Sequence, residues 1–271
     1  MNAEGATDHG GFEVRTYFVR GRNALVARAD FAELFVDYYL HQAEQGRIVA
    51  QPALDELLKE TLAALTLHCA SRPWNESWAW TIHLREPLLN IFVAGDNRRG
   101  SIIGQLFAEN VKDDGRNLFL ADLVRDRGDP RRSAIEFSGN KPVRIVEQFY
   151  ARSEQRPARY FHFGGDEMVM VSAQPECDLT WLAALDDEAV RVLDQSETLS
   201  LLEQRVYRWQ CGCTEGRMLA VLAPIMRSDP VGLFGNENVL RMNCPRCGAK
   251  HTITREALEA FLSGSHEPDT R

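Results

Sequence analysis

Stretches rich in β-branched and aromatic residues, broken by polar turns, dominate the first two thirds of the chain. Residues 12–29 have this character around a turn, which predicts a strand or hairpin. Five similar stretches follow between residues 77 and 138, separated by turn sequences such as GDNRRG, and predict an antiparallel meander. Residues 158–174 predict another hairpin, which turns at Gly164-Gly165-Asp166.

Helical periodicity interrupts these strands at three places. Asp30 is followed three residues later by Glu33, a capping box that predicts a helix over residues 30–44. In residues 51–70 the leucines recur on one helical face, and a third, shorter helix is expected before Pro157. We therefore predict an α+β fold: a tail over residues 1–11, then one N-terminal α+β domain over residues 12–177.

The pattern changes in residues 178–210. Four apolar residues follow one another at spacings of 3, 4 and 3, as on one face of a helix: Leu199, Leu202, Val206 and Trp209. We predict an amphipathic helical linker, and we expect this stripe to bind client proteins. Because isolated helices shorter than about 12–15 residues are marginal in water, the linker must dock on another part of the protein.

The last part of the chain, residues 211–264, predicts a helix, a hairpin and a closing helix, followed by a tail over residues 265–271. This unit contains two close pairs of cysteines, which form C-x-C, a gap of thirty residues and C-x-x-C: Cys211, Cys213, Cys244 and Cys247. Buried apolar cysteines are the alternative explanation, but two close pairs in so small a unit rarely arise by chance.

Four thiolates arranged as a tetrahedron select zinc. In the sequence CPRCG, Pro245 fixes one backbone angle of the turn, and Gly248 can adopt the positive φ that brings N–H groups close to sulfur. We therefore predict that these four cysteines bind one zinc ion per chain in the reduced state. A unit of this size buries little core, so metal binding is expected to hold it folded.

The C-x-C pair also suggests redox chemistry. Its two sulfurs can meet in a strained, reducible disulfide, and Gly212 eases that turn. Two states are therefore open to the centre: zinc-bound thiolates, or the two disulfides Cys211–Cys213 and Cys244–Cys247.

Charge and composition narrow the function classes. The net charge is −8, which argues against non-specific binding to nucleic acid or to an anionic membrane. The zinc unit itself has no basic surface, because the nine Lys/Arg and seven Asp/Glu of residues 205–271 are balanced by a tetrathiolate zinc of charge −2. A nucleic-acid-binding zinc module is thus the weaker alternative. No apolar run could span a bilayer, and the polar start does not have the pattern of a signal peptide, so we expect a cytoplasmic protein.

The chain resembles the heat shock protein 33 family over roughly residues 12 to 262. The resemblance rests on the C-x-C and C-x-x-C spacing, on VRG at residues 19–21, and on VEQFYARSEQRPAR at residues 146–159. The order of the elements also agrees, while the segment before Cys211 is shorter than in the family.

The resemblance implies a redox-regulated, ATP-independent holdase of the bacterial stress response. In that family the reduced zinc form is inactive. Peroxide or hypochlorous acid oxidises the cysteines and releases zinc, and the linker and zinc domain then unfold. The exposed apolar surface binds unfolding clients. The active form is a homodimer, and clients pass later to ATP-dependent foldases. The shorter linker leaves a second hypothesis open, a constitutive zinc-stabilised chaperone or scaffold.

Other candidate sites have simpler explanations. His68 and Cys69 are adjacent on a helix and cannot face each other, so we expect no catalytic dyad. Cys177 lies between two acidic residues that disfavour a thiolate. His251 follows the knuckle but is not needed where four sulfurs fill a tetrahedron. With no catalytic motif in the sequence, we do not expect an enzyme.

Overall fold

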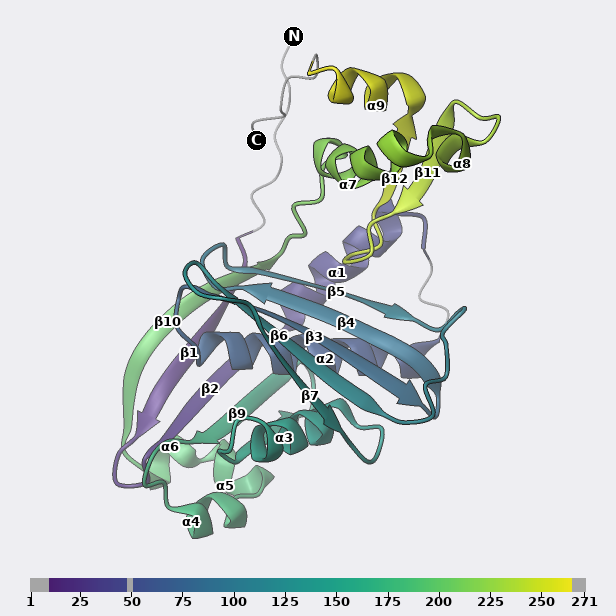
Figure 1. The fold of residues 1–271 in the computed structure, drawn as a ribbon. Coiled ribbons are helices and arrows are strands. Elements are labelled where there is room, and N and C mark those ends of the chain that lie inside the picture. Colours follow the sequence, from purple (N-terminus) through teal and green to yellow (C-terminus); the bar gives the residue numbers. More distant parts are fainter. Residues whose placement is uncertain (1–9, 48–50, 265–271) are drawn as a thin grey trace.

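The computed structural model describes residues 10–47 and 51–264, so the predicted tails lie outside the described residues except for Gly10 and Gly11. Ten strands form one large sheet in the order β7-β6-β3-β4-β5-β10-β1-β2-β9-β8, and β11 pairs with β12 in a separate hairpin (Figure 1). The strands are β1 (Phe12–Val19), β2 (Ala24–Asp30), β3 (Glu76–Arg85), β4 (Leu88–Asp96), β5 (Ser101–Phe107), β6 (Leu118–Arg125), β7 (Arg131–Glu136), β8 (Ala158–Phe163), β9 (Glu167–Ala173), β10 (Leu199–Trp209), β11 (Val239–Asn243) and β12 (Lys250–Thr254).

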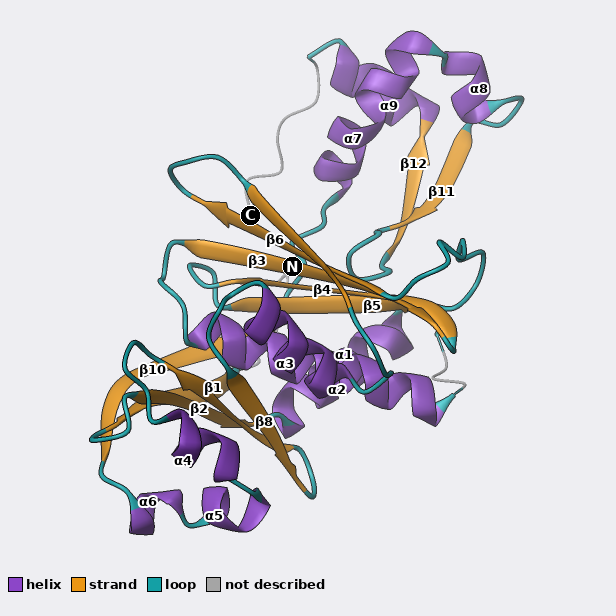
Figure 2. Cartoon of the chain, turned by 60° about the horizontal axis from the view of Figure 1, so that its bottom comes forward, coloured by secondary structure: helices purple, strands orange, loops and turns teal. Residues whose placement is uncertain are grey.

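The helices separate into three groups. α1 to α3 lie against the large sheet, α4 to α6 cover one end of it, and α7 to α9 surround the β11–β12 hairpin (Figures 1 and 2). Their bounds are α1 (Ala32–Glu44), α2 (Pro52–Ala70), α3 (Pro142–Arg152), α4 (Leu179–Ala184), α5 (Asp187–Arg191), α6 (Leu193–Ser196), α7 (Glu215–Ser228), α8 (Pro230–Phe234) and α9 (Arg255–Leu262). No helix in the part of the chain that the structure describes is long and apolar enough to cross a membrane.

The centre of the large core is α2. The sheet bends so that its two halves, β3 to β7 and β1-β2-β8-β9, lie on either side of this helix (Figure 2). Every residue from Thr61 to Ala70 is buried, and a helix that is apolar all round needs such an enclosed position. Large aromatic side chains complete this core, among them Trp80, Phe119 and Phe149.

The remaining helices form two smaller cores. Leu182, Leu185 and Leu193 of the α4–α6 segment pack on the outer face of the β1-β2-β9-β8 half. The C-terminal unit has its own cluster, which includes Leu219 and Leu258, and it is distinct from the main core.

The structure confirms the α+β class and the predicted hairpins, meander and main helices. It corrects one detail of α1. The helix begins one residue later than the capping box predicts: its N-cap is Phe31, and Asp30 Oδ1 accepts a hydrogen bond from the Ala32 N–H at 2.9 Å.

The prediction that residues 178–210 form a helical linker is wrong in its second half. Residues 179–196 do form three short helices, but Leu199–Trp209 is strand β10 inside the large sheet, antiparallel to β1 and parallel to β5. In this part of the chain the side chains alternate between the two faces of the strand, so that Arg205 and Tyr207 point inward. Tyr207 donates to Asn97 Oδ1 at 2.8 Å, and Arg205 Nη1 donates to the Cys69 carbonyl at 3.2 Å.

Candidate metal centre

The four predicted cysteines come together at the junction between the large sheet and the C-terminal unit. Cys211 and Cys213 lie between β10 and α7, and Cys244 and Cys247 lie in the turn between β11 and β12. All four sulfur atoms lie within 4.8 Å of one another. The Sγ–Sγ distance is 3.7 Å for Cys211–Cys244 and 3.6 Å for Cys213–Cys247. A tetrahedron with Zn–S bonds of about 2.3 Å has edges of about 3.8 Å, so the cluster fits a four-coordinate zinc ion.

Local backbone chemistry shapes the first cysteine pair. Gly212 has φ +64°, which a side chain would disfavour, and its carbonyl accepts a hydrogen bond from Arg217 Nη1 at 2.6 Å. Thr214 caps α7, so Cys211 and Cys213 lie just before the positive end of that helix dipole. This end favours thiolates over thiols.

The second pair lies in a tight knuckle. The Gly248 N–H donates to the Cys244 carbonyl at 2.8 Å, the Cys244 N–H donates to the Ala249 carbonyl at 2.7 Å, and Gly248 has φ +77°. The Ala249 N–H also donates to the sulfur of Cys247. The knuckle thus has the positive glycine φ and the N–H contact to sulfur that the CPRCG sequence predicts.

Contacts among the four sulfur atoms shift the pKa values of their thiols. Hydrogen bonds from the thiols of Cys213 and Cys247 lower the pKa of Cys211 to about 2. The contact with Cys211 raises the pKa of Cys213 to about 12, and that of Cys247 further. The contacts among these sulfurs thus favour the thiolate of Cys211 and disfavour those of Cys213 and Cys247. A divalent cation at the centre of the cluster is what allows all four to be thiolates.

The knuckle docks on the last turn of α1. His41 Nε2 donates to the Cys247 carbonyl at 3.0 Å, and the Lys250 N–H donates to Gln45 Oε1 at 2.7 Å. The His41 ring also lies 5.6 Å from the Trp209 ring, at the end of β10. The centre is thus tied to the sheet domain both through the chain at Trp209 and through α1.

Sequence reasoning did not find these α1 residues. His41 and Cys247 are 206 positions apart. The only local signal is a basic residue in the last turn of a helix, where His, Lys and Arg are common for other reasons. Such a contact follows from the placement of two surfaces, which no local pattern encodes.

The other two cysteines lie apart from the cluster. Cys69 is fully buried in α2, and burial raises the pKa of its thiol. Burial and the neighbouring Asp178 raise the pKa of Cys177 too. Both directions agree with the expectation that these two thiols are unreactive. The adjacent His68 is bound to the Tyr150 hydroxyl at 2.7 Å in the core.

Because these residues lie on a strand, the four members of the predicted apolar stripe have different surroundings. Leu199 packs on the α4–α6 cluster and Trp209 packs on the main core. Leu202 and Val206 are instead 54% and 46% exposed, and neighbouring Leu201 is 52% exposed. The four residues therefore do not form one docked face, and their role in client binding stays a proposal.

The fold and the site together define a class: a mixed α+β protein whose large sheet domain carries a small unit built around four cysteines. No family model matches the chain. Two curated relatives are 33 kDa chaperonins, one from Edwardsiella ictaluri, 22% identical over 250 residues, and one from Shewanella frigidimarina, 20% identical over 249 residues. These alignments cover 80% and 81% of this chain and 85% and 86% of the relatives.

A solved structure has the same fold. The 33 kDa chaperonin (heat shock protein 33 homologue) of Thermotoga maritima superposes with a TM-score of 0.70 at 14% identity, over 94% of this chain and 99% of the other. The resemblance to the heat shock protein 33 family is therefore confirmed, at the distance these identities imply.

Proposed function

We propose that this protein is a redox-regulated, ATP-independent holdase chaperone. Two kinds of support stand behind this proposal: the relatives that share most of the chain are named chaperonins, and the four cysteines form one compact cluster. The observation that carries the redox part is the meeting of all four sulfurs at the junction with α1. A change at the sulfurs there alters the contact between the two parts of the protein.

The inactive state in this proposal is the reduced one. Cys211, Cys213, Cys244 and Cys247 would hold one zinc ion, which neutralises the thiolates and fixes both halves of the C-terminal unit. His41 and Gln45 hold the knuckle against α1. The small cluster around Leu219 and Leu258 stays covered as long as this unit is folded.

Oxidation removes the ligands. Formation of each disulfide takes two electrons from a pair of thiolates. With hydrogen peroxide as the oxidant, two protons are consumed and two molecules of water are released. A disulfide sulfur is no longer an anionic zinc ligand, so the unit loses its main source of stability. Its apolar residues then become available to unfolding clients.

The proposed partners follow from this role. Clients are unfolded or unfolding proteins, bound without a catalytic step. The oxidised form is proposed to be a homodimer that passes clients to ATP-dependent foldases. A reducing compartment such as the cytoplasm suits four free thiols that are poised for oxidation.

A second candidate function, a constitutive chaperone or scaffold stabilised by zinc, has one specific observation in its favour. Residues 199–209, where a metastable helix was expected, are a strand in the middle of the sheet. Leu202 and Val206 are already exposed without any unfolding. If these side chains bind clients, they can do so in the reduced protein.

One experiment distinguishes the two candidate functions. Aggregation of a thermally unfolding client is followed by light scattering with reduced and with peroxide-treated protein, while a chromogenic dye measures released zinc. The redox-regulated proposal expects suppression of aggregation only after zinc release. Cys177→Ser, outside the cluster, should behave as the wild type. Equal suppression in both states favours the constitutive chaperone, and no suppression in either state contradicts both.

A further inference from the structure

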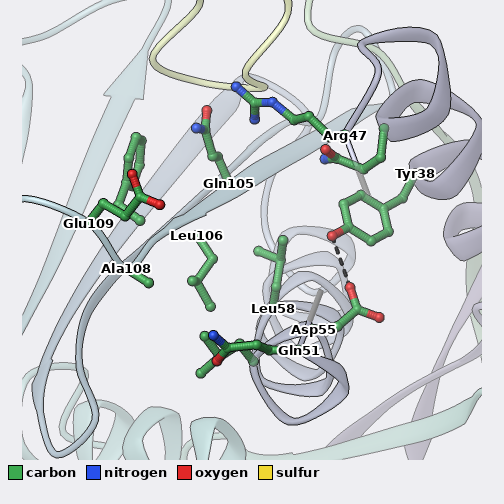
Figure 3. Close-up of a pocket in the computed structure, with 12 residues that line it drawn as sticks. Tyr38, Arg47, Gln51, Asp55, Leu58, Gln105, Leu106, Ala108 and Glu109 are labelled. Carbon is green, nitrogen blue, oxygen red and sulfur yellow. Dashed lines mark hydrogen bonds between the residues drawn. The ribbon is translucent and has the colours of Figure 1, made fainter. Parts of the chain in front are cut away.

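A groove of about 530 Å³ lies beside the docked knuckle, between the end of α1, the start of α2 and the end of β5 (Figure 3). Its size is within the range of about 300–1,000 Å³ typical of ligand pockets. The floor is apolar, with Leu58 and Leu106, and the polar side chains of Arg47 and Gln105 stand at one end.

One wall of this groove is an unpaired strand edge. β10 pairs with β5 only at Arg208–Ser101 and Trp209–Ile102. The Gln210 N–H donates to the Ile102 carbonyl at 3.3 Å, and among residues 10–47 and 51–264 no further backbone pairing follows along this side of β5. Because backbone groups of alternate residues point to the same side, the N–H and C=O groups of Leu106, which lines the groove, face the gap, whereas Gly104 on the same side of the strand is buried.

Arg47 supplies a free positive charge to the groove. Within residues 10–47 and 51–264 it has no ion pair with a carboxylate. The nearby Asp55 is not available, since the hydroxyls of Tyr38 (2.9 Å) and Tyr39 both donate to it. Gln105 Oε1 is a buried acceptor without a partner among the described residues. The Arg47 end of the groove thus offers unused polar contacts.

We propose that an extended segment of an unfolded client adds to the free edge of β5, with alternating apolar and acidic side chains. Backbone groups of the segment would pair with the N–H and C=O groups of Leu106, as in recognition by strand addition. Successive side chains of a strand point to opposite faces, so apolar residues would meet Leu58 and Leu106 while an acidic residue between them reaches Arg47. This inference rests on the proposed chaperone function and specifies the client chemistry.

The position of Arg47 links this groove to the metal centre. A Cβ added at Gly248 would clash with the Arg47 guanidinium, so this group lies directly against the knuckle. Docking of the knuckle therefore restricts the side chain that would anchor the client segment. Undocking removes this restriction.

The test uses a labelled peptide, acetyl-Val-Glu-Val-Thr-Val-amide, and fluorescence anisotropy with the peroxide-treated, zinc-released protein, the state that binds clients in the proposed function. A peptide with Lys in place of Glu should bind at least about tenfold more weakly, because it places a positive charge beside Arg47. Two N-methylated peptides test strand addition, one methylated at the valines and one at Glu and Thr. Only one of these sets faces β5, so one peptide should lose binding and the other should keep it.

Arg47→Gln provides the protein-side test. Binding of the Glu peptide should weaken about tenfold, the effect of losing a charge-assisted hydrogen bond. In this variant a Glu→Gln change in the peptide should have no further effect, as expected of a direct pair. Arg227→Gln, an exposed arginine on α7, is the matched control and should bind as the wild type.

Equal binding of the Glu and Lys peptides, or equal loss with both N-methylated peptides, would overturn this inference. If the wild type suppresses client aggregation but does not bind the peptide, the inference fails while the chaperone function stands. If the peptide binds as expected but no state of the protein suppresses aggregation, the proposed chaperone function fails instead.

Discussion

At the scale of single residues, the metal centre depends on sulfurs that differ in exposure. Cys244 and Cys247 are each 1% exposed, whereas Cys211 and Cys213 are half-buried. A buried sulfur that loses its metal partner has no water to replace that contact. We therefore expect the two knuckle cysteines to tolerate substitution least.

Replacing one ligand should abolish metal binding. Cys244→Ser removes a soft sulfur from the buried half of the cluster, and a serine hydroxyl is a poor zinc ligand at neutral pH. Elemental analysis of the reduced protein should give about one zinc per chain for the wild type and almost none for this variant. Cys177→Ser is the control and should retain zinc. A wild-type protein purified under reducing conditions without zinc would contradict the metal assignment.

The disulfides of the oxidised centre are a separate prediction. We expect Cys211 to pair with Cys213 and Cys244 with Cys247, because each pair is close in sequence and closes a short loop. Short Sγ–Sγ distances in this structure run between the pairs, 3.7 Å for Cys211–Cys244 and 3.6 Å for Cys213–Cys247, so proximity in the folded state does not itself select this pattern. Peptide mapping by mass spectrometry decides it. Predominant Cys211–Cys244 crosslinks would show that folded proximity, and not loop length, governs the pairing.

His41 gives a test of the docking contact. Replacing it by alanine removes the hydrogen bond to the Cys247 carbonyl, which is worth about 0.5–1.5 kcal/mol. Zinc release by peroxide should then become faster, and amide hydrogen exchange at residues 247–250 should increase. His162→Ala is a matched control, because it removes a similar bond, to the Gly165 carbonyl at 3.1 Å, far from the cysteines. Unchanged zinc release in the His41 variant would show that docking on α1 does not protect the centre.

At the scale of elements, sequence patterns predicted strands and helices well where they are local. The 12–29 and 158–174 hairpins have turns flanked by β-branched residues, and α2 has a full apolar periodicity. β10 was missed for a physical reason. Its register against β1 shifts between Thr16 and Tyr17, so a bulge breaks the period of two. The remaining apolar residues then imitate the spacing of a helix.

Because β10 is a strand and not a linker helix, substitutions on it should have different effects from those expected of a linker. Leu202 and Val206 are exposed on β10, so Leu202→Ser with Val206→Thr removes apolar surface without opening the core. We expect the melting temperature to change little and holdase activity in reducing buffer to stay absent. Client binding by the oxidised protein should weaken if these side chains contact clients. Activity in the reduced variant would instead show that this strand gates the protein.

At the scale of the whole molecule, the cysteine centre was predictable because its four ligands lie in two short motifs of fixed spacing. The docking on α1 and the groove beside it were not, because they require the end of α1, the edge of β5 and the knuckle to meet in space. The strand order of the large sheet could not be predicted from local sequence patterns for the same reason. Its order places β10 between β1 and β5, and this arrangement joins segments almost two hundred residues apart.

The two parts of the molecule should therefore respond differently to metal removal. The C-terminal unit buries few apolar side chains, and structural zinc contributes about 10–16 kcal/mol in comparable peptides. The sheet domain has a continuous core around α2 that contains no metal ligand.

We expect a strong chelator under reducing conditions to unfold residues 211–264 while the sheet domain stays folded. In hydrogen exchange, the amides of α7, α9 and the β11–β12 hairpin should lose protection, and those of α2 and β3 should keep it. Cys69→Ala, which leaves all four ligands in place, should give the same pattern. If chelation instead removed protection from both parts together, the zinc unit would be an integral part of the sheet domain's stability, and its selective unfolding could not be the switch.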